Sequence, residues 1–271
     1  MKARSAAAPY MLWSAIFIII PLVLVAISAF TAGEGGFTLA NFKDSVEFAP
    51  VIFNSIWLSM IATAICLIIA YPLAYIISRQ SAVGQRTMIM LIMLPMWINF
   101  LLTTYAWMTL LEENGLINKF FGLLGLGPFE LINTQGAVVL GMVYNYLPFM
   151  ILPIYSVMVK VDHLLIEAAH DLGCNPRDTM KNVVLPLSMP GVTTGIIMVF
   201  VPSVSTFVIS RMLGGGSFML IGDLIEMQFL GNTYNPELGS AISMVLMVII
   251  LICMALTDIF QDAEEKEGLL L

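Results

Sequence analysis

The sequence predicts an all-α integral membrane protein with six transmembrane helices. Of its 271 residues, 59% are hydrophobic and only 11% are charged, and the mean hydropathy is +0.95. A soluble domain carries about 25% charged residues. This shortage of charge means that most of the protein surface faces membrane lipid rather than water.

Six apolar segments are each long enough to cross a bilayer as a helix, which takes about 20 residues. None of them contains Asp, Glu, Lys or Arg, and together they form one transmembrane domain over residues 1–271. The segments are residues 10–30, 51–78, 87–111, 136–159, 188–210 and 239–257. The first follows Lys2 and Arg4 as a secretory signal would, but its length and the five later spans favour an uncleaved helix.

Proline residues within the spans predict kinks, because a bundle can satisfy the carbonyl groups that proline leaves free. Such kinks either line a pathway or are simply tolerated in membrane helices. The residues are Pro21, Pro72, Pro95, Pro148, Pro153 and Pro202.

The distribution of basic residues predicts that both termini are cytoplasmic, in a multi-pass protein of the cell membrane. Three basic residues fall on the outer side, and eight fall on the side of the termini: Lys2, Arg4, Arg79, Arg86, Lys160, Arg177, Lys181 and Lys266. The outer loops, residues 31–50, 112–135 and 211–238, hold nine carboxylates. They are either an attractant for a cationic solute or ordinary solvated surface.

Composition also excludes several classes of protein. The net charge of −7 argues against nucleic-acid binding, which requires a basic face. The three cysteines show no disulfide or zinc spacing, and no cofactor is expected in this chain.

The longest cytoplasmic loop, residues 160–187, has a helical pattern. Leucines and alanines recur at helical spacing from residue 164 to 172. Gly173 is placed to end this helix in a left-handed cap. Asn175 and Pro176 have the residue types of an N-cap and a first helical position. We therefore expect two short helices beneath the membrane. A metal site formed by His163, Glu167 and His170 is a weak alternative, because Glu167 is already part of the motif described next.

The same loop resembles the EAA loop of ATP-binding-cassette (ABC) importer permeases. That family pattern is E-A-A, three residues, G, nine residues, I-x-L-P, and only Val183 departs from it. The resemblance implies a type I ABC importer permease fold with a cytoplasmic coupling helix. The residues that it implies for coupling to an ATPase are Glu167, Ala168, Ala169, Asp171, Gly173, Leu185 and Pro186.

The resemblance also implies partners. These are ATPase subunits that bind ATP and Mg²⁺, a second permease subunit that is related but different, and an extracytoplasmic solute-binding protein. The chain has no G-x-x-x-x-G-K-[ST] motif and no catalytic motif, so it is expected not to be an enzyme itself. A stand-alone secondary transporter or channel is disfavoured because the spans hold no ionisable pathway residues.

Shorter stretches resemble the spermidine/putrescine branch of this family, although another small solute is the alternative. They include Leu94-Pro95 with Trp97, Tyr144 to Pro148, and Phe200 to Pro202. A polyamine is a polycation, so aromatic faces, amides and carboxylates suit its path. The expected pathway residues are Trp97, Asn99, Tyr105, Trp107, Tyr144, Asn145, Asp223 and Glu226. For the aromatic residues, anchoring at the membrane interface is the alternative.

Overall fold

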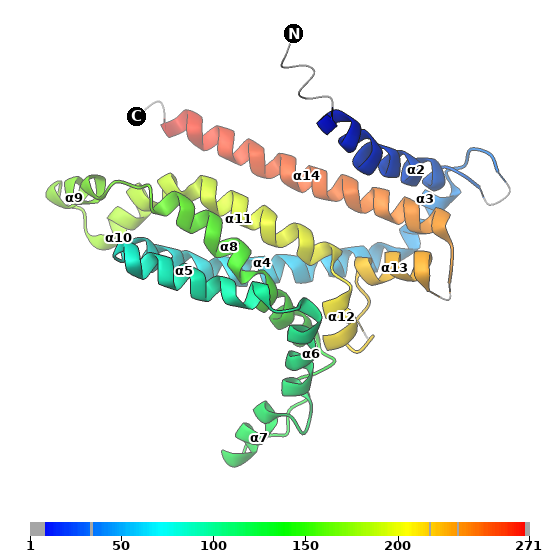
Figure 1. Cartoon of the computed structure of the whole chain (residues 1–271), viewed down its shortest axis with the longest axis horizontal. Coiled ribbons are helices and arrows are strands. Elements are labelled where there is room, and N and C mark those ends of the chain that lie inside the picture. The colour runs from blue at the N-terminus through cyan, green and yellow to red at the C-terminus, as the bar shows by residue number, and fades with distance from the viewer. Residues whose placement is uncertain (1–8, 33–34, 217, 232, 269–271) are drawn as a thin grey trace, which may run out of the picture.

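The computed structural model describes residues 9–32, 35–216, 218–231 and 233–268, without the side chains of His163 and of residues 258–268. Lys2, Arg4 and Glu34 lie outside the described residues. Within the described part, every element is a helix apart from one isolated β-bridge between Thr31 and Phe37. The predicted all-α membrane fold is therefore confirmed (Figure 1).

The helices follow one another in a long series. They are η1 (Ala15–Ile19), α2 (Ile20–Ala29), α3 (Ala40–Ser45), η2 (Val46–Phe48), α4 (Ala49–Ser78), α5 (Ala82–Trp97), α6 (Phe100–Leu111), α7 (Leu116–Leu123), α8 (Gln135–Met158), α9 (His163–Asp171), α10 (Pro176–Thr179), η3 (Met180–Val184), α11 (Leu185–Ser205), α12 (Val208–Leu213), α13 (Ile221–Leu230) and α14 (Pro236–Gly268).

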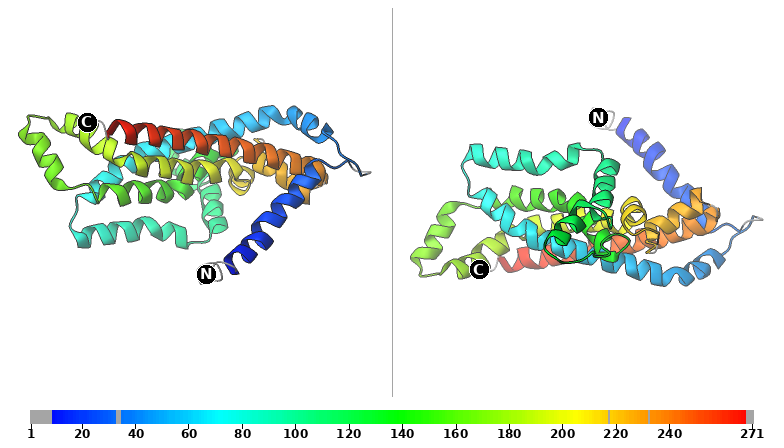
Figure 2. Two further views of the ribbon diagram at one scale, coloured as in Figure 1. Left: turned by 90° about the horizontal axis from the view of Figure 1, so that it is seen from above. Right: turned by 90° about the horizontal axis from the view of Figure 1, so that it is seen from below.

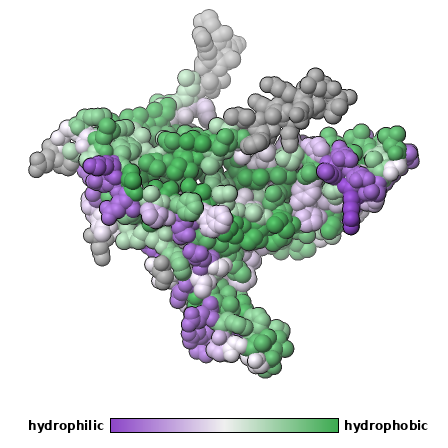
Figure 3. Space-filling model, turned by 180° about the vertical axis from the view of Figure 1, so that it is seen from behind, coloured by the Kyte–Doolittle hydropathy of each residue, from purple (hydrophilic) through white to green (hydrophobic). Residues whose placement is uncertain are grey.

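Five single helical runs are long and apolar enough to cross a membrane. They are Pro9–Ala29, Ala40–Ser78, Gln135–Met158, Pro176–Ser205 and Pro236–Thr257, and a bent pair, α5 with the α6–α7 segment, makes six if it counts as one span. Figure 3 shows a broad apolar surface along the bundle, with hydrophilic side chains gathered mainly at its two ends and on the projecting arm. This distribution fits a bundle whose sides face lipid.

The third predicted span, residues 87–111, is wrong as one continuous helix. The chain bends by 87° between Ala82–Trp97 and Phe100–Leu123. Ile98 is extended, and the side chain of Asn99 caps the new helix by accepting hydrogen bonds from the backbone N–H groups of Leu101 and Leu102. As a result, α6 and α7 turn away from the bundle (Figure 1).

The second short helix predicted under the membrane is also not a separate element. The helix that begins at Pro176 continues through a π-helical turn into α11 as one run to Ser205. The fifth span therefore begins before residue 188 and ends before residue 210, where Thr206 is extended. Because α10 and α11 form one continuous helix, a displacement of α10 would also displace the transmembrane helix α11.

Helix α8 lies at the centre, where it packs against α4 and α11. Small residues bring the backbones together: a β-carbon at Gly195 would lie 2.7 Å from the sulfur of Met150. Such contacts drive helix association in lipid, where burial of apolar surface gains little. Figure 2 shows α14, α11, α8 and α5 side by side, with the N-terminal helix diverging from them.

The N-terminal run Pro9–Ala29 contacts α14 but has 0% of its apolar window buried within this chain. The side surface that does not contact α14 is therefore available to lipid or to another protein.

Candidate functional site

A pocket of about 270 Å³ lies where the third span breaks, between the α5–α6 corner and the middle of α8. It is lined by Pro95, Met96, Ile98, Phe100, Tyr144, Asn145, Tyr146, Pro148 and Phe149. Two of the predicted kink prolines, Pro95 and Pro148, are thus part of its wall. Proline and the break at Ile98 widen the space between two helices that would otherwise pack closely.

The polar centre of the pocket is Asn145. Its Nδ2 donates a hydrogen bond of 2.8 Å to the carbonyl oxygen of Gly141, one turn earlier in α8. Its Oδ1 accepts no hydrogen bond from the described residues, so it remains available as an acceptor. Beside it, Tyr144 meets the ring of Trp107 edge-on, with centroids 5.3 Å apart, and the Tyr146 hydroxyl donates to the Pro202 carbonyl at 3.4 Å.

The structure brings together only part of the predicted pathway. Tyr144 and Asn145 line the pocket and Trp107 supports Tyr144. Trp97, at the end of α5, is 71% exposed, and Tyr105 is also exposed on α6. Asn99 caps α6 with its amide oxygen, which accepts the backbone N–H groups of Leu101 and Leu102.

Sequence reasoning missed most of the apolar wall, namely Met96, Ile98, Phe100 and Phe149. A helix break predicted from Pro95 and Asn99 could have identified them. A proline followed within four residues by a good N-cap marks the end of one helix and the start of another.

The two predicted carboxylates lie elsewhere, on α13, where both face Arg211 of α12. Arg211 donates two hydrogen bonds to Glu226, one of them 3.2 Å from Nη1 to Oε1. Its Nε lies 4.0 Å from Oδ1 of the buried Asp223. Oδ2 of Asp223 also accepts the backbone N–H of Leu220, which begins α13. These carboxylates therefore hold two short helices together and do not line the pocket.

Their titration reflects two different environments. The hydrogen bond from Arg211 holds the pKa of Glu226 below its usual value. Burial raises the pKa of Asp223, an effect that outweighs the hydrogen bonds and the charge of Arg211 acting in the opposite direction. The cost of burying a charge thus exceeds the attraction of a partner at the edge of salt-bridge range.

The predicted coupling loop forms α9 with a well-defined cap at each end. Asp162 accepts the backbone N–H of Leu164 at the start. At the other end Gly173 has φ +87°. Its N–H bonds to the His170 carbonyl, and the Cys174 N–H bonds to the Ala169 carbonyl, which is the Schellman pattern. The left-handed cap predicted at Gly173 is confirmed.

The next helix begins as the residue types indicated. Asn175 accepts the backbone N–H groups of Arg177 and Asp178 at 2.9 and 3.0 Å, and Pro176 occupies the first turn. Hydrogen bonds therefore define the end of α9 and the start of α10 on either side of this turn.

The two alanines of the motif lie on different faces of α9. Ala169 is 7% exposed and faces inward, as Ile166 does, whereas Ala168 is exposed. The outer face instead presents Ala168, Glu167 and Asp171, together with the exposed side chains of Leu164, Leu165 and Leu172. Leu185 and Pro186 lie on the continuous helix, where Leu185 borders a second pocket.

In the described part of the chain, no group of three or more His, Cys, Asp or Glu residues is placed to hold a metal ion. The side chain of His163, which belongs to the weak metal alternative, lies outside that part.

Helices long and apolar enough to span a membrane, an aromatic pocket beside a broken span and a capped helix at one end are the features expected of a multi-pass membrane permease. The chain belongs to the family described as binding-protein-dependent transport system inner membrane component, which it matches over residues 67–266.

Several curated relatives are similar along most of their length. The spermidine/putrescine transport system permease protein PotB of Haemophilus influenzae is 36% identical, over 88% of this chain and 86% of that protein. The protein of the same name from Escherichia coli K12 is 32% identical, over 88% and 90%. The inner membrane ABC transporter permease protein YdcU of Escherichia coli K12 is 29% identical, over 80% and 74%.

A solved structure supports the fold. A chain of a bacterial ABC transporter involved in the import of the acidic polysaccharide alginate superposes with a TM-score of 0.81 at 15% identity, over 96% of this chain and 95% of that one. The predicted type I permease fold is confirmed. A shared fold does not fix the solute, which depends on the side chains of the site.

Proposed function

We propose that this chain is one permease subunit of an ATP-driven importer that carries polyamines, such as spermidine or putrescine, into the cell. The observation that carries the proposal is the 36% identity, over 88% of the chain, to a permease named for these solutes. The pocket at the broken span supports it through its chemistry.

A polyamine alternates ammonium groups with methylene spacers, so it needs π-faces and acceptors along an apolar path. The pocket offers the rings of Phe100, Tyr144, Tyr146 and Phe149, and a cation over such a face gains about 0.5–2 kcal/mol. The free Oδ1 of Asn145 can accept an ammonium N–H. Among the described lining residues there is no carboxylate, so binding would be weak enough to allow release.

The proposed assembly includes a second, related permease subunit. None of the residues in the apolar window of the N-terminal helix is buried within this chain. The α6–α7 arm projects from the bundle (Figure 1). Both features suit packing against another transmembrane subunit. The second half of the polyamine path would then lie across that interface.

The proposed ATPase docks on α9, whose outward face carries three exposed leucines beside Glu167. ATP and Mg²⁺ bind to that partner and not to this chain. Closure of the ATPase pair would move α9, and the capped turn at Gly173 would pass this movement to the α10–α11 helix. In this arrangement α9 and both termini are cytoplasmic, and a solute-binding protein docks at the end that carries α13.

The test is uptake of radiolabelled spermidine into proteoliposomes that contain this chain with the second permease subunit, the ATPase and the solute-binding protein. We expect Asn145→Leu to raise the KM for spermidine about tenfold, the value of one hydrogen bond to a charged group, with ATP hydrolysis retained. Leu102→Ala, at an exposed site on α6 that does not line the pocket, serves as the control. An unchanged KM in Asn145→Leu would show that the pocket does not bind the polyamine during transport.

A further inference from the structure

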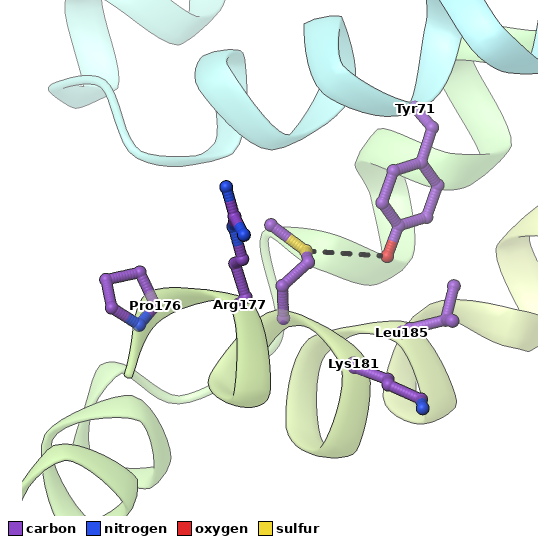
Figure 4. Close-up of a pocket in the computed structure, with 6 residues that line it drawn as sticks. Tyr71, Pro176, Arg177, Lys181 and Leu185 are labelled. Carbon is purple, nitrogen blue, oxygen red and sulfur yellow. Dashed lines mark hydrogen bonds between the residues drawn. The ribbon is translucent and has the colours of Figure 1, made fainter. Parts of the chain in front are cut away.

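A second pocket, of about 470 Å³, opens between α4 and the α10–α11 helix, directly behind α9. Its lining residues are Tyr71, Pro176, Arg177, Met180, Lys181 and Leu185 (Figure 4). The surface exposed within it is almost entirely apolar. It is separate from the pocket at the broken span, and neither the coupling motif nor the proposed pathway uses its basic residues.

Three lining residues follow one another at intervals of four along the α10–α11 helix: Arg177, Lys181 and Leu185. The π-helical turn Met180–Val184 lies between the first and the last of them. Tyr71 forms the opposite wall, with its hydroxyl 3.9 Å from the sulfur of Met180. With a rise of about 1.5 Å per residue, Tyr71 lies about 10 Å from the end of α4. The groove therefore follows the two helices away from the end of the bundle.

Two unpaired cations stand at the rim of this groove. Arg177 and Lys181 are exposed, and neither forms a salt bridge with a described residue. In Figure 4 the guanidinium of Arg177 extends across the mouth towards α4 and α5, while Lys181 leaves the same helix beside Leu185. Arg177 thus lies at the α10 end of the groove, and Lys181 lies between Arg177 and Leu185.

We propose that this groove binds one anionic phospholipid. An acyl chain would lie against Tyr71, Met180 and Leu185, and the headgroup phosphate would be held at Arg177 and Lys181. Basic pockets between transmembrane helices select anionic headgroups in this way. A small soluble anion would leave the apolar wall uncovered, and a zwitterionic lipid would leave the two cations without a matching net charge. The inference depends on membrane embedding and not on the solute that is carried.

Because of the position of the groove, a bound lipid would affect how α10 packs against the bundle. It would fill the space between α4 and α10, the first turn of the helix that follows α9. A bound lipid would brace this part of the chain against the bundle, so its loss would loosen α10 without changing the pocket at the broken span.

The test is native mass spectrometry of the full-length chain, purified in detergent and titrated with phosphatidylglycerol or phosphatidylcholine. We expect wild type to retain one phosphatidylglycerol and to prefer it over phosphatidylcholine. The double variant Arg177→Gln/Lys181→Gln should bind phosphatidylglycerol about thirtyfold more weakly. The matched control is Arg86→Gln/Lys160→Gln, which removes two exposed cations that do not line the groove and should bind as wild type does.

A third variant separates a lipid site from a simple anion site. Leu185→Trp fills the deep part of the groove and keeps both cations, so it should also lose phosphatidylglycerol. Retained binding in Leu185→Trp, or displacement of the lipid by excess inorganic phosphate, would overturn the proposal in favour of an anion site. Equal weakening in both double variants would overturn it in favour of non-specific charge attraction. Helical circular dichroism checks that each variant is folded.

Discussion

The carbonyl oxygen of Pro153 lies only 2.8 Å from the position that a β-carbon at Gly191 would occupy. This contact, together with that of Gly195 four residues later, lets α11 lie directly on α8. Because the neighbouring atom is backbone, it cannot turn aside as a flexible side chain could. We expect Gly191→Ala to destabilise the fold by about 1–3 kcal/mol through overpacking, measured as the melting temperature in detergent.

Gly136→Ala is the matched control for this prediction. The nearest atom to a β-carbon there is the Thr134 hydroxyl at 3.7 Å, which is ordinary contact. Gly136→Ala should therefore melt at or above the wild-type temperature. Equal melting of Gly191→Ala and wild type would show that α8 and α11 do not approach as described.

A second prediction concerns the corner of the broken span. Asn99→Leu removes the cap of α6 and should cost about 1 kcal/mol, whereas Asn99→Ser keeps a capping oxygen and should be nearly neutral. Thermal unfolding of both variants measures the difference. If Asn99 instead acted as a polar contact for the solute, Asn99→Ser would lose uptake without losing stability.

The buried carboxylate on α13 gives a third prediction. Its raised pKa means that the folded state favours protonated Asp223. Stability from this group is greatest below the unfolded value of about 3.9, and it is lost as pH rises through the higher folded pKa. Asp223→Asn keeps an acceptor for the Leu220 N–H and carries no charge. We expect it to melt higher than wild type at pH 7, and Asp223→Ala, which loses the cap, to melt lower.

Glu226 should show the opposite pH dependence. Its folded pKa is lowered by Arg211, so its contribution is present above the unfolded value of about 4.3 and is lost as pH falls through the lower folded pKa. Glu226→Gln should therefore lose less stability than wild type as the pH falls from 7 to 3. Melting curves from pH 7 down to pH 3 follow both residues, and identical curves for Glu226→Gln and wild type would contradict the pairing.

Docking of an ATPase on α9 gives a fifth prediction. Leu172 is 87% exposed on α9, and Leu123, on the distant helix α7, is 86% exposed. Leu172→Glu should abolish copurification of the ATPase, because it places a charge in an apolar contact. Leu123→Glu makes the same change at the same exposure and should not affect it. Loss of the ATPase in both variants would point to a general effect on folding.

Local signals in the sequence predicted local structure well. The order Gly173, Asn175, Pro176 specifies the end of one helix and the start of the next, and the structure has both caps. Glycine and asparagine encode these features through their own backbone preferences, so no distant residue is needed. The apolar runs likewise predicted membrane helices from composition alone.

Features that depend on distant parts of the chain were not predictable. The burial of Ala169 rather than Ala168 is decided by which side of α9 meets the bundle. Arg211 reaches Glu226 across fifteen residues of intervening chain, so Glu226 looked like a free carboxylate. The cap formed by Asn99 was missed for a different reason: the surrounding apolar run concealed a cap signal that was present.

ATP-dependent uptake of labelled spermidine distinguishes a polyamine importer from the alternatives, in proteoliposomes that hold this chain with its second permease, ATPase and solute-binding protein. We expect uptake that requires ATP and all four components, and that unlabelled putrescine reduces. Uptake by this chain alone without an ATPase, or an ATP-driven complex that imports another solute and no polyamine, would contradict this expectation.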